Sequence, residues 1–339
     1  MTRKPSSLKS VQQAGVPSTV QLFPPVNIRR GHHVCTQRPS PSLVVKFPRD
    51  DKLRRAVFGP DQKHPAKMHF GLALELARLY ARPGDTILDP FGGMGTTGVA
   101  AMAHGCHAVL TEIEPEWAES SKAVVHRQAT GTINEIWEYE HQTPVSQLRW
   151  YNNRVLAGAD WEQIHAARAV VHNIDARALD LELVPGGVDA VITSPPYLNM
   201  FGAPSKPRVL QGKTQNASYT MDHSSSNLAR ESSPHFFGLK LAQVYRAAAS
   251  VLVPGGAFVV VCKDPIRQNR RQRFALQNIL ILEALGLEMR DWWRRECTPS
   301  LYANVQRKQF PDAPRVDHED VLVFQKPLEY PSVVPGEHP

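Results

Sequence analysis

The chain has 339 residues, enough to bury one large core and carry an extension. Its 39 Lys and Arg residues exceed its 32 Asp and Glu residues, and this basic balance favours a polyanionic partner. No run reaches about 18 apolar residues, so we expect no membrane-spanning helix. Four cysteines without paired spacing argue against a zinc site and fit a reducing compartment, so we expect no metal.

The predicted elements divide the chain into an arm, a core and a tail. Residues 1–59 are rich in Pro, Ser, Lys and Arg, which predicts a flexible basic arm. Residues 60–330 alternate strand-like and helix-like segments, which predicts an α/β fold with a parallel sheet and helices on both faces; residues 331–339 form the tail. We expect strands at Thr86–Leu88, His107–Leu110, Val170–Ile174, Val188–Ile192, Ala257–Val261, Leu287–Trp292 and Val321–Phe324. We expect helices at Gly71–Tyr80, Thr96–Ala103, Glu116–Ala129, Leu239–Val251 and Phe274–Leu285.

A glycine-rich turn, Asp89 to Thr97, follows the first expected core strand. An acid followed by glycines lets the backbone approach a ligand, and the next helix offers free amide groups at its N-terminus. The pair Gly93 and Gly95 lacks the third glycine of the dinucleotide fingerprint. The turn is therefore interpreted either as a cofactor pocket or as an ordinary strand-to-helix connection.

A second motif, Thr193-Ser194-Pro195-Pro196-Tyr197, follows the apolar strand at residues 188–192. The prolines stiffen the loop and remove two donors. The Ser194 hydroxyl and the Pro195 carbonyl oxygen can accept hydrogen bonds from an amino group, and the Tyr197 ring offers a face on which a base can stack. The loop suits an aminated base, the alternative being a proline-rich turn with a buried tyrosine. Because both motifs follow strand ends, we expect them to face one crevice.

Together the two motifs resemble those of the amino-methylating DNA methyltransferases, which use S-adenosylmethionine to methylate cytosine N4 or adenine N6. The resemblance covers roughly residues 63–326 with gaps, and the cofactor loop precedes the catalytic loop. It implies the class I methyltransferase fold, which is Rossmann-like with a seven-stranded, mostly parallel sheet. It also implies S-adenosylmethionine as the cofactor and double-stranded DNA as the partner.

The resemblance further implies roles for individual residues. Lys67 lies in a segment that looks like the one before the family's cofactor strand, and Glu112 falls where the family has a ribose-binding acid. Asp175 falls where the family has an acid or polar side chain that contacts the adenine amino group of the cofactor. The implied cofactor-binding residues are Lys67, Asp89, Phe91, Gly93, Gly95, Thr96, Thr97, Glu112 and Asp175. The implied catalytic residues are Ser194, Pro195, Pro196 and Tyr197.

The chemistry follows from the residue types of the catalytic loop. An aromatic amine is a poor nucleophile until acceptors, here Ser194 and Pro195, hold its hydrogens, after which its nitrogen attacks the sulfonium methyl in line. A base in a duplex must first be flipped out of the stack. No cysteine lies near the loop, so methylation of cytosine at C5 is set aside. Within the family, a serine at the position of Ser194 favours cytosine N4 as the methylated atom, with adenine N6 as the alternative.

Other interpretations stay open: an RNA base methyltransferase, a protein-glutamine methyltransferase, or an inactive fold that only holds DNA. The glutamine enzymes carry asparagine where this chain has Ser194, and the complete set of site residues argues against an inactive protein. We also expect a cytoplasmic protein of a bacterial or phage-infected cell, with a possible cognate restriction endonuclease.

Two long segments and a basic cluster interrupt the regular pattern. Residues 130–168 mix aromatics with Arg, which suits either a target-recognition insert or a helical hairpin packed on the core. Residues 199–234 are polar and Ser-rich, and they either close over the flipped base or are disordered. The cluster of Arg267, Arg270, Arg271 and Arg273 is interpreted as a phosphate contact or a solvated face.

Overall fold

The computed structural model describes residues 41, 44–47, 49–59, 68–127, 167–197, 227–267, 270–297 and 315–329. Lys67, the tail and most of the two candidate inserts lie outside these ranges. Within the described part, no helix is both long and apolar enough to cross a membrane.

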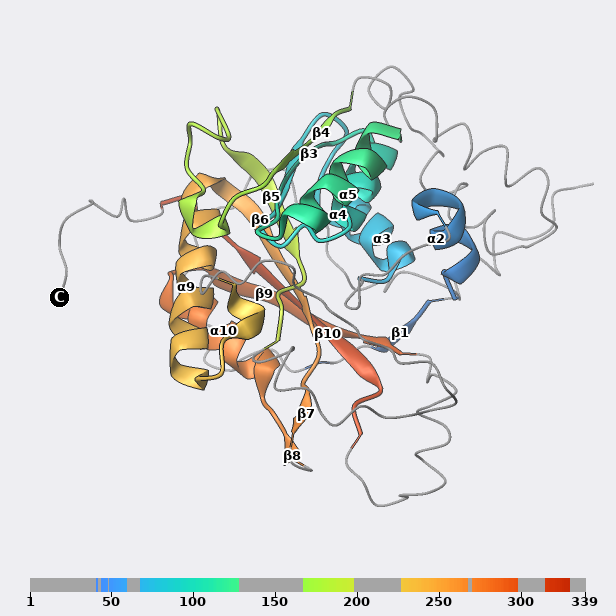
Figure 1. Ribbon diagram of the computed structural model, residues 1–339. Helices are drawn as coiled ribbons and strands as arrows, with labels where there is room; N and C mark the ends of the chain where they lie inside the picture. The colour runs from blue at the N-terminus through green and yellow to red at the C-terminus, as the bar shows by residue number, and fades with distance from the viewer. Residues whose placement is uncertain are drawn as a thin grey trace, which may run out of the picture.

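A single mixed sheet organises the described chain (Figure 1). Its strands lie in the order β1 (Val44–Lys46), β9 (Glu288–Glu296), β10 (His318–Gln325), β6 (Leu252–Cys262), β5 (Val188–Thr193), β2 (Thr86–Asp89), β3 (His107–Thr111) and β4 (Ala169–His172). Strand β10 runs antiparallel to both of its neighbours, and the other pairings are parallel. This mostly parallel α/β sheet agrees with the fold that the resemblance implies, with eight strands in place of the expected seven.

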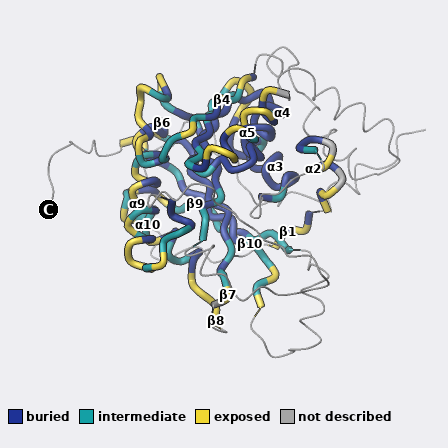
Figure 2. Tube along the Cα trace, in the orientation of Figure 1, coloured by how far each residue is buried: buried dark blue, intermediate teal, exposed yellow. Residues whose placement is uncertain are grey.

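Helices cover both faces of the sheet, as predicted (Figure 1). One face is covered by α2 (Asp51–Phe58), α3 (Phe70–Tyr80), α4 (Thr96–Ala103) and α5 (Pro115–Arg127). The other is covered by α9 (Pro234–Val251), α10 (Phe274–Ala284) and the short 3₁₀ turns η2 (Ala176–Ala178) and η3 (Leu228–Arg230). Central strands such as β5 are therefore buried on both sides, which is why their sequences are mostly apolar (Figure 2).

The eighth strand comes from the predicted N-terminal arm. Val45 of β1 lies beside Arg295 of β9 in a parallel pairing, and Leu53 and Val57 of α2 are buried in the core. The expectation of a flexible arm up to residue 59 is thus corrected for residues 44–58, because their few apolar side chains complete the edge of the sheet. Residues 1–40 lie outside the described part.

The two sequence motifs meet where the strand order reverses. From β2 the chain continues outward to β3 and β4, whereas β5 and β6 extend the sheet in the other direction. The backbone pairing of β2 with β5 joins Ile87 to Ala190 and Leu88 to Val191. Asp89 and Thr193 follow at the carboxyl edge, where ligands of doubly wound sheets bind.

Candidate active site at the carboxyl edge of the sheet

Asp89 connects the two motif loops. Its buried carboxylate accepts hydrogen bonds from the Thr193 hydroxyl (2.6 Å) and the Phe91 backbone N–H (3.0 Å) through Oδ1, and from the Thr97 hydroxyl (2.6 Å) through Oδ2. Burial raises the pKa of Asp89, and these hydrogen bonds act in the opposite direction. One carboxylate therefore fixes the glycine-rich turn against the last residue of β5.

The glycines of the turn serve close packing on β3 and α5. The Gly92 N–H donates to the Thr111 carbonyl (2.8 Å), and a Cβ at Gly92 would lie 2.9 Å from Leu110 Cβ. Gly95 precedes α4 with φ +80°, and a Cβ there would lie 2.7 Å from Ser121 Oγ. At Gly95 only glycine meets both demands, which are a left-handed backbone and no side-chain volume.

Two further acids follow neighbouring strands. The Glu112 carboxylate accepts from the backbone N–H groups of Gly93 (2.9 Å) and Glu114 (2.9 Å), and burial raises the pKa of Glu112 to about 7. Asp175 caps η2 and pairs with Arg177. Burial acts to raise the pKa of Asp175, but the hydrogen bonds and charge of Arg177 outweigh it and the pKa is lowered. Asp175 thus remains an ionised acceptor.

These residues line one cleft with about 1070 Å³ of empty space that is open to solvent. The predicted site residues in its wall are Asp89, Phe91, Gly93, Thr96, Thr97, Glu112, Asp175, Ser194, Pro195 and Pro196. Gly95 lies behind the wall, and Lys67 lies outside the described residues. The structure does not place Tyr197 in the wall, because its ring packs against Phe274 with centroids 5.3 Å apart.

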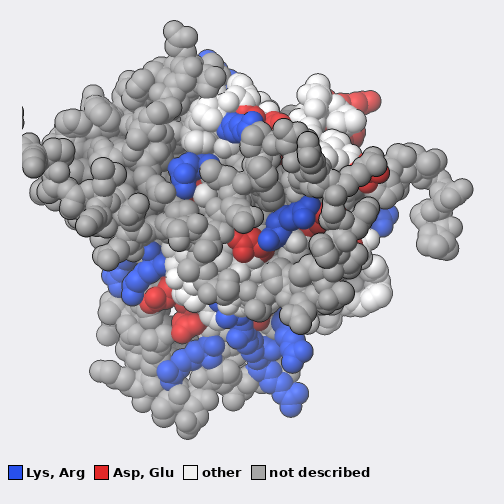
Figure 3. All heavy atoms as spheres, turned by 180° about the vertical axis from the view of Figure 1, so that it is seen from behind, with Lys and Arg blue, Asp and Glu red and all other residues white. Residues whose placement is uncertain are grey.

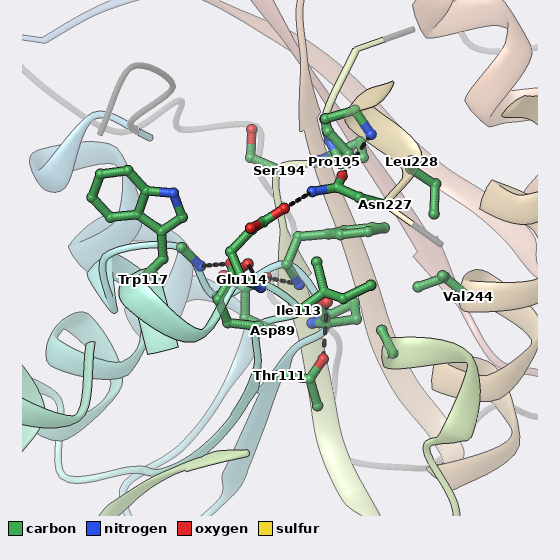
Figure 4. Close-up of a pocket in the computed structure, with 18 of the residues that line it drawn as sticks. Asp89, Thr111, Ile113, Glu114, Trp117, Ser194, Pro195, Asn227, Leu228 and Val244 are labelled. Atoms are coloured by element: carbon green, nitrogen blue, oxygen red, sulfur yellow. Dashed lines mark hydrogen bonds between the residues drawn. The ribbon is translucent and has the colours of Figure 1, made fainter. Parts of the chain in front are cut away.

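Sequence reasoning missed the pair Glu114 and Asn227. The Asn227 side-chain amide donates to the Glu114 carboxylate, and its oxygen accepts from the Ala229 N–H (2.9 Å). Both side chains are buried, and Figure 4 shows them pointing toward one another in the cleft that Ser194 and Pro195 also line. Glu114 stands two residues after the predicted Glu112, but Asn227 ends a Ser-rich stretch without periodicity.

Arg54 supports the cleft from behind. Its buried guanidinium donates to the Met68 carbonyl (2.8 Å) and the Thr96 hydroxyl (3.4 Å), and it lies 4.8 Å from the centre of the Phe58 ring. Met68 and Thr96 both line the cleft. Arg54 was missed because it lay in the segment expected to be flexible.

The cleft thus combines carboxylate acceptors, apolar surface from Ile113 and Trp117, and the loop acceptors Ser194 and Pro195. Such a set suits an organic ligand with hydroxyl and amino groups. Within the described residues, no group of three or more His, Cys, Asp or Glu side chains is placed to hold a metal ion.

One part of the chain is similar to a known family of proteins. Residues 30–123 match the family model described as DNA methylase, of the N6 and N4 methyltransferase type. The type II methyltransferase M2.MboI of Moraxella bovis is 35% identical over 74 residues, which cover 22% of this chain and 27% of that protein. The alignment thus spans about a quarter of the length of that curated relative.

Solved structures similar to this one include several methyltransferases. A SAM-dependent methyltransferase of Methanosarcina mazei gives a TM-score of 0.41 at 11% identity, covering 75% of this chain and 98% of that one. A methyltransferase of Pyrococcus furiosus gives 0.40 at 16% identity, covering 82% and 94%. Magnesium protoporphyrin IX methyltransferase of Synechocystis, solved with bound SAM, gives 0.39 at 12% identity, covering 81% and 90%.

Proposed function

We propose that this chain, whose residues 30–123 match a DNA methylase family model, methylates the exocyclic amino group of a base in duplex DNA with S-adenosylmethionine as cofactor. The observation that carries the proposal is the bridge from Asp89 to Thr193 and Thr97. Through it the turn of a cofactor pocket and the acceptors of a catalytic loop line the same cleft.

The cleft fits S-adenosylmethionine by its donor and acceptor chemistry. Glu112 offers a carboxylate to the two ribose hydroxyls, and the ionised Asp175 offers an acceptor to the adenine amino group. Ile113 supplies apolar surface beside them for the adenine ring. When bound, this cofactor supplies an electrophilic sulfonium methyl.

The loop acceptors act on the target amine. The Ser194 hydroxyl and the Pro195 carbonyl oxygen accept its two hydrogens, which returns electron density to the nitrogen that the ring would otherwise withdraw. The stiffness of the two prolines and the anchor of Thr193 on Asp89 keep these acceptors in place, so the loop contributes orientation rather than a covalent intermediate. The role of Tyr197 as a stacking platform stays a prediction.

We propose cytosine N4 as the methylated atom, in a base flipped out of the duplex, because serine stands at the first position of the loop. Adenine N6 is the alternative, and the same acceptors would serve its amino group. The description of the Moraxella bovis relative as a type II methyltransferase is the ground for expecting a cognate restriction endonuclease.

Methyl transfer tests the proposal directly. The purified protein is incubated with methyl-labelled S-adenosylmethionine and mixed-sequence duplex DNA, and the nucleosides are analysed by mass spectrometry. Ser194→Ala removes one loop acceptor, and Ser250→Ala is the matched control because the exposed Ser250 bonds to Ala247 in the last turn of α9. We expect N4-methylcytosine with the wild type and the control, and a strong loss with Ser194→Ala.

Three results would contradict parts of the proposal. N6-methyladenine would overturn the choice of base and keep the site. Label in RNA alone would overturn the substrate. Tight cofactor binding without transfer to either nucleic acid would overturn the activity.

A further inference from the structure

A small two-stranded hairpin stands apart from the main sheet. Strands β7 (Ile266–Arg267) and β8 (Arg270–Arg271) pair antiparallel directly after β6, the neighbour of the β5 strand that carries the catalytic loop. In Figure 1 the hairpin projects below the body of the molecule, clear of the helices. None of its described residues, 266, 267, 270 and 271, lines the cleft.

The base of the hairpin is anchored to the core. Buried Asp264 accepts hydrogen bonds from Arg271 Nε (2.9 Å) and from the Ala275 backbone N–H (2.9 Å) in the first turn of α10. Arg271 also donates to His318 Nε2 (3.3 Å) at the start of β10. Tyr197 of the catalytic loop packs on Phe274, the first residue of the same helix. The hairpin is therefore held in a fixed relation to the catalytic loop.

The outward side of this segment carries unneutralised positive charge. Residues 265–273 contain four arginines and no Asp or Glu. Arg271 is paired with Asp264, whereas Arg270 and Arg273 are exposed and, among the described residues, neither forms an ion pair. Figure 3 shows Lys and Arg side chains gathered at the lower end of the molecule, the level at which the hairpin lies in Figure 1. Charges left without carboxylates beside the active edge suit a polyanion.

We propose that the β7–β8 hairpin, through Arg270 and Arg273, holds the phosphate backbone of duplex DNA next to the target base. This inference rests on the proposed function. Arginine pairs with phosphate through two parallel N–H donors, and such contacts set the position of the duplex without reading its sequence. Arg271 is the tether that fixes the hairpin, and Arg270 and Arg273 are the contacts.

A matched pair of double variants tests the assignment. Arg270→Gln with Arg273→Gln removes two positive charges from the hairpin. Arg82→Gln with Arg290→Gln removes the same charge from the opposite edge, because Arg82 precedes β2 and Arg290 lies near the start of β9. Arg270→Lys with Arg273→Lys keeps the charge and checks that the hairpin tolerates replacement.

Duplex binding is followed by fluorescence anisotropy between about 50 and about 200 mM salt. We expect the slope of log Kd against log salt to fall by about two for the hairpin glutamine variant, one unit per lost phosphate contact. The slope should stay at the wild-type value for the opposite-edge variant and for the lysine variant. S-adenosylmethionine affinity, measured by calorimetry, should be the same in all four proteins.

An unchanged slope in the hairpin variant, or an equal fall in the opposite-edge variant, overturns the inference. A fall seen with RNA and absent with duplex DNA also overturns it. If any of these three results is found while the wild type methylates DNA, the inference alone fails. If the slopes behave as expected and no methyl group is transferred, the proposed activity alone fails.

Discussion

Replacing Thr193 by Val removes the link between the two loops while keeping the shape of the side chain. Thr193 is fully buried, and its hydroxyl donates to Asp89 Oδ1 at 2.6 Å. The backbone pairing of β2 with β5 is formed by Ile87 and Leu88, so this side-chain bond is the next tie between the strands. We expect Thr193→Val to weaken both the fold and the placement of Ser194, the residue that follows it.

The magnitude follows from the charge of the acceptor. A hydrogen bond to a charged group contributes about 1.5–3 kcal/mol, and Asp89 keeps its bonds from Phe91 and Thr97. We therefore expect a loss of about 2 kcal/mol in the free energy of unfolding near neutral pH. The lost bond also lowered the pKa of Asp89, so Thr193→Val raises it further. An acid whose pKa is raised in the folded state stabilises the fold more when it is protonated. The loss in the free energy of unfolding caused by Thr193→Val should therefore be smaller near about pH 4 than near about pH 7.

Thr97→Val is the matched control, because its hydroxyl donates to the other oxygen of Asp89 at the same distance, 2.6 Å. Urea unfolding should give similar losses for the two variants. Methyl transfer at saturating cofactor should fall more for Thr193→Val, since Thr97 lies on the cofactor side of the carboxylate. Equal rates in the two variants, or wild-type stability for Thr193→Val, would refute this account of the bridge.

Three further predictions concern the acid Glu112, Gly95 in the glycine-rich turn, and Lys326 after strand β10. Burial raises the pKa of Glu112 to about 7, and in the proposed complex its carboxylate form accepts from the ribose, so cofactor affinity measured by calorimetry should increase as the pH rises through about 7. In Glu112→Gln the affinity should not change with pH, and a matching increase there would count against the proposed role. Gly95→Ala should cost about 1–3 kcal/mol in urea unfolding, because the backbone has φ +80° and the new Cβ meets Ser121 Oγ at 2.7 Å; a neutral variant would contradict that. Lys326→Met should cost about 2–3 kcal/mol in the same assay, since the buried ammonium donates to the Leu252 carbonyl at 2.6 Å near the end of α9; an unchanged midpoint would show that water replaces it.

The centre of the sheet was predictable from local patterns. Strand β5 and the second half of β6 are buried on both faces, so their sequences are mostly apolar, and that pattern predicts a strand without knowledge of its partner. The turns after β2 and β5 carry their own signals, glycine in one and proline in the other. Because parallel strands end at one edge, the meeting of the two motifs in a single cleft also followed from the sequence.

The N-terminal edge was not predictable in this way. Strand β1 has three residues, and only Val45 of them is buried. Its partner β9 begins more than 200 residues later in the chain, so no local pattern marks the pairing. Helix α2 has the sequence DKLRRAVF, whose charges are typical of a solvated segment, yet Arg54 is buried. Its burial is stabilised by the Phe58 ring, one turn later in the same helix, and by the Met68 carbonyl and the Thr96 hydroxyl, which only the folded chain brings to it.

The side-chain bonds of the site that sequence reasoning missed join segments that are far apart in the chain. Asn227 and Glu114 are 113 residues apart, and Asp89 and Thr193 are 104 residues apart. A motif search finds the residues that would touch a ligand, because their chemistry is local, but it does not find the bonds that set one motif against another. In this cleft those bonds end on carboxylates that have little exposure to water, so a lost donor is not replaced by water and the charge-assisted bond is lost in full. A few polar side chains therefore fix the position of the glycine-rich turn relative to the Ser-Pro-Pro-Tyr loop, and the stability measurements on Thr193 and Thr97 test two of them.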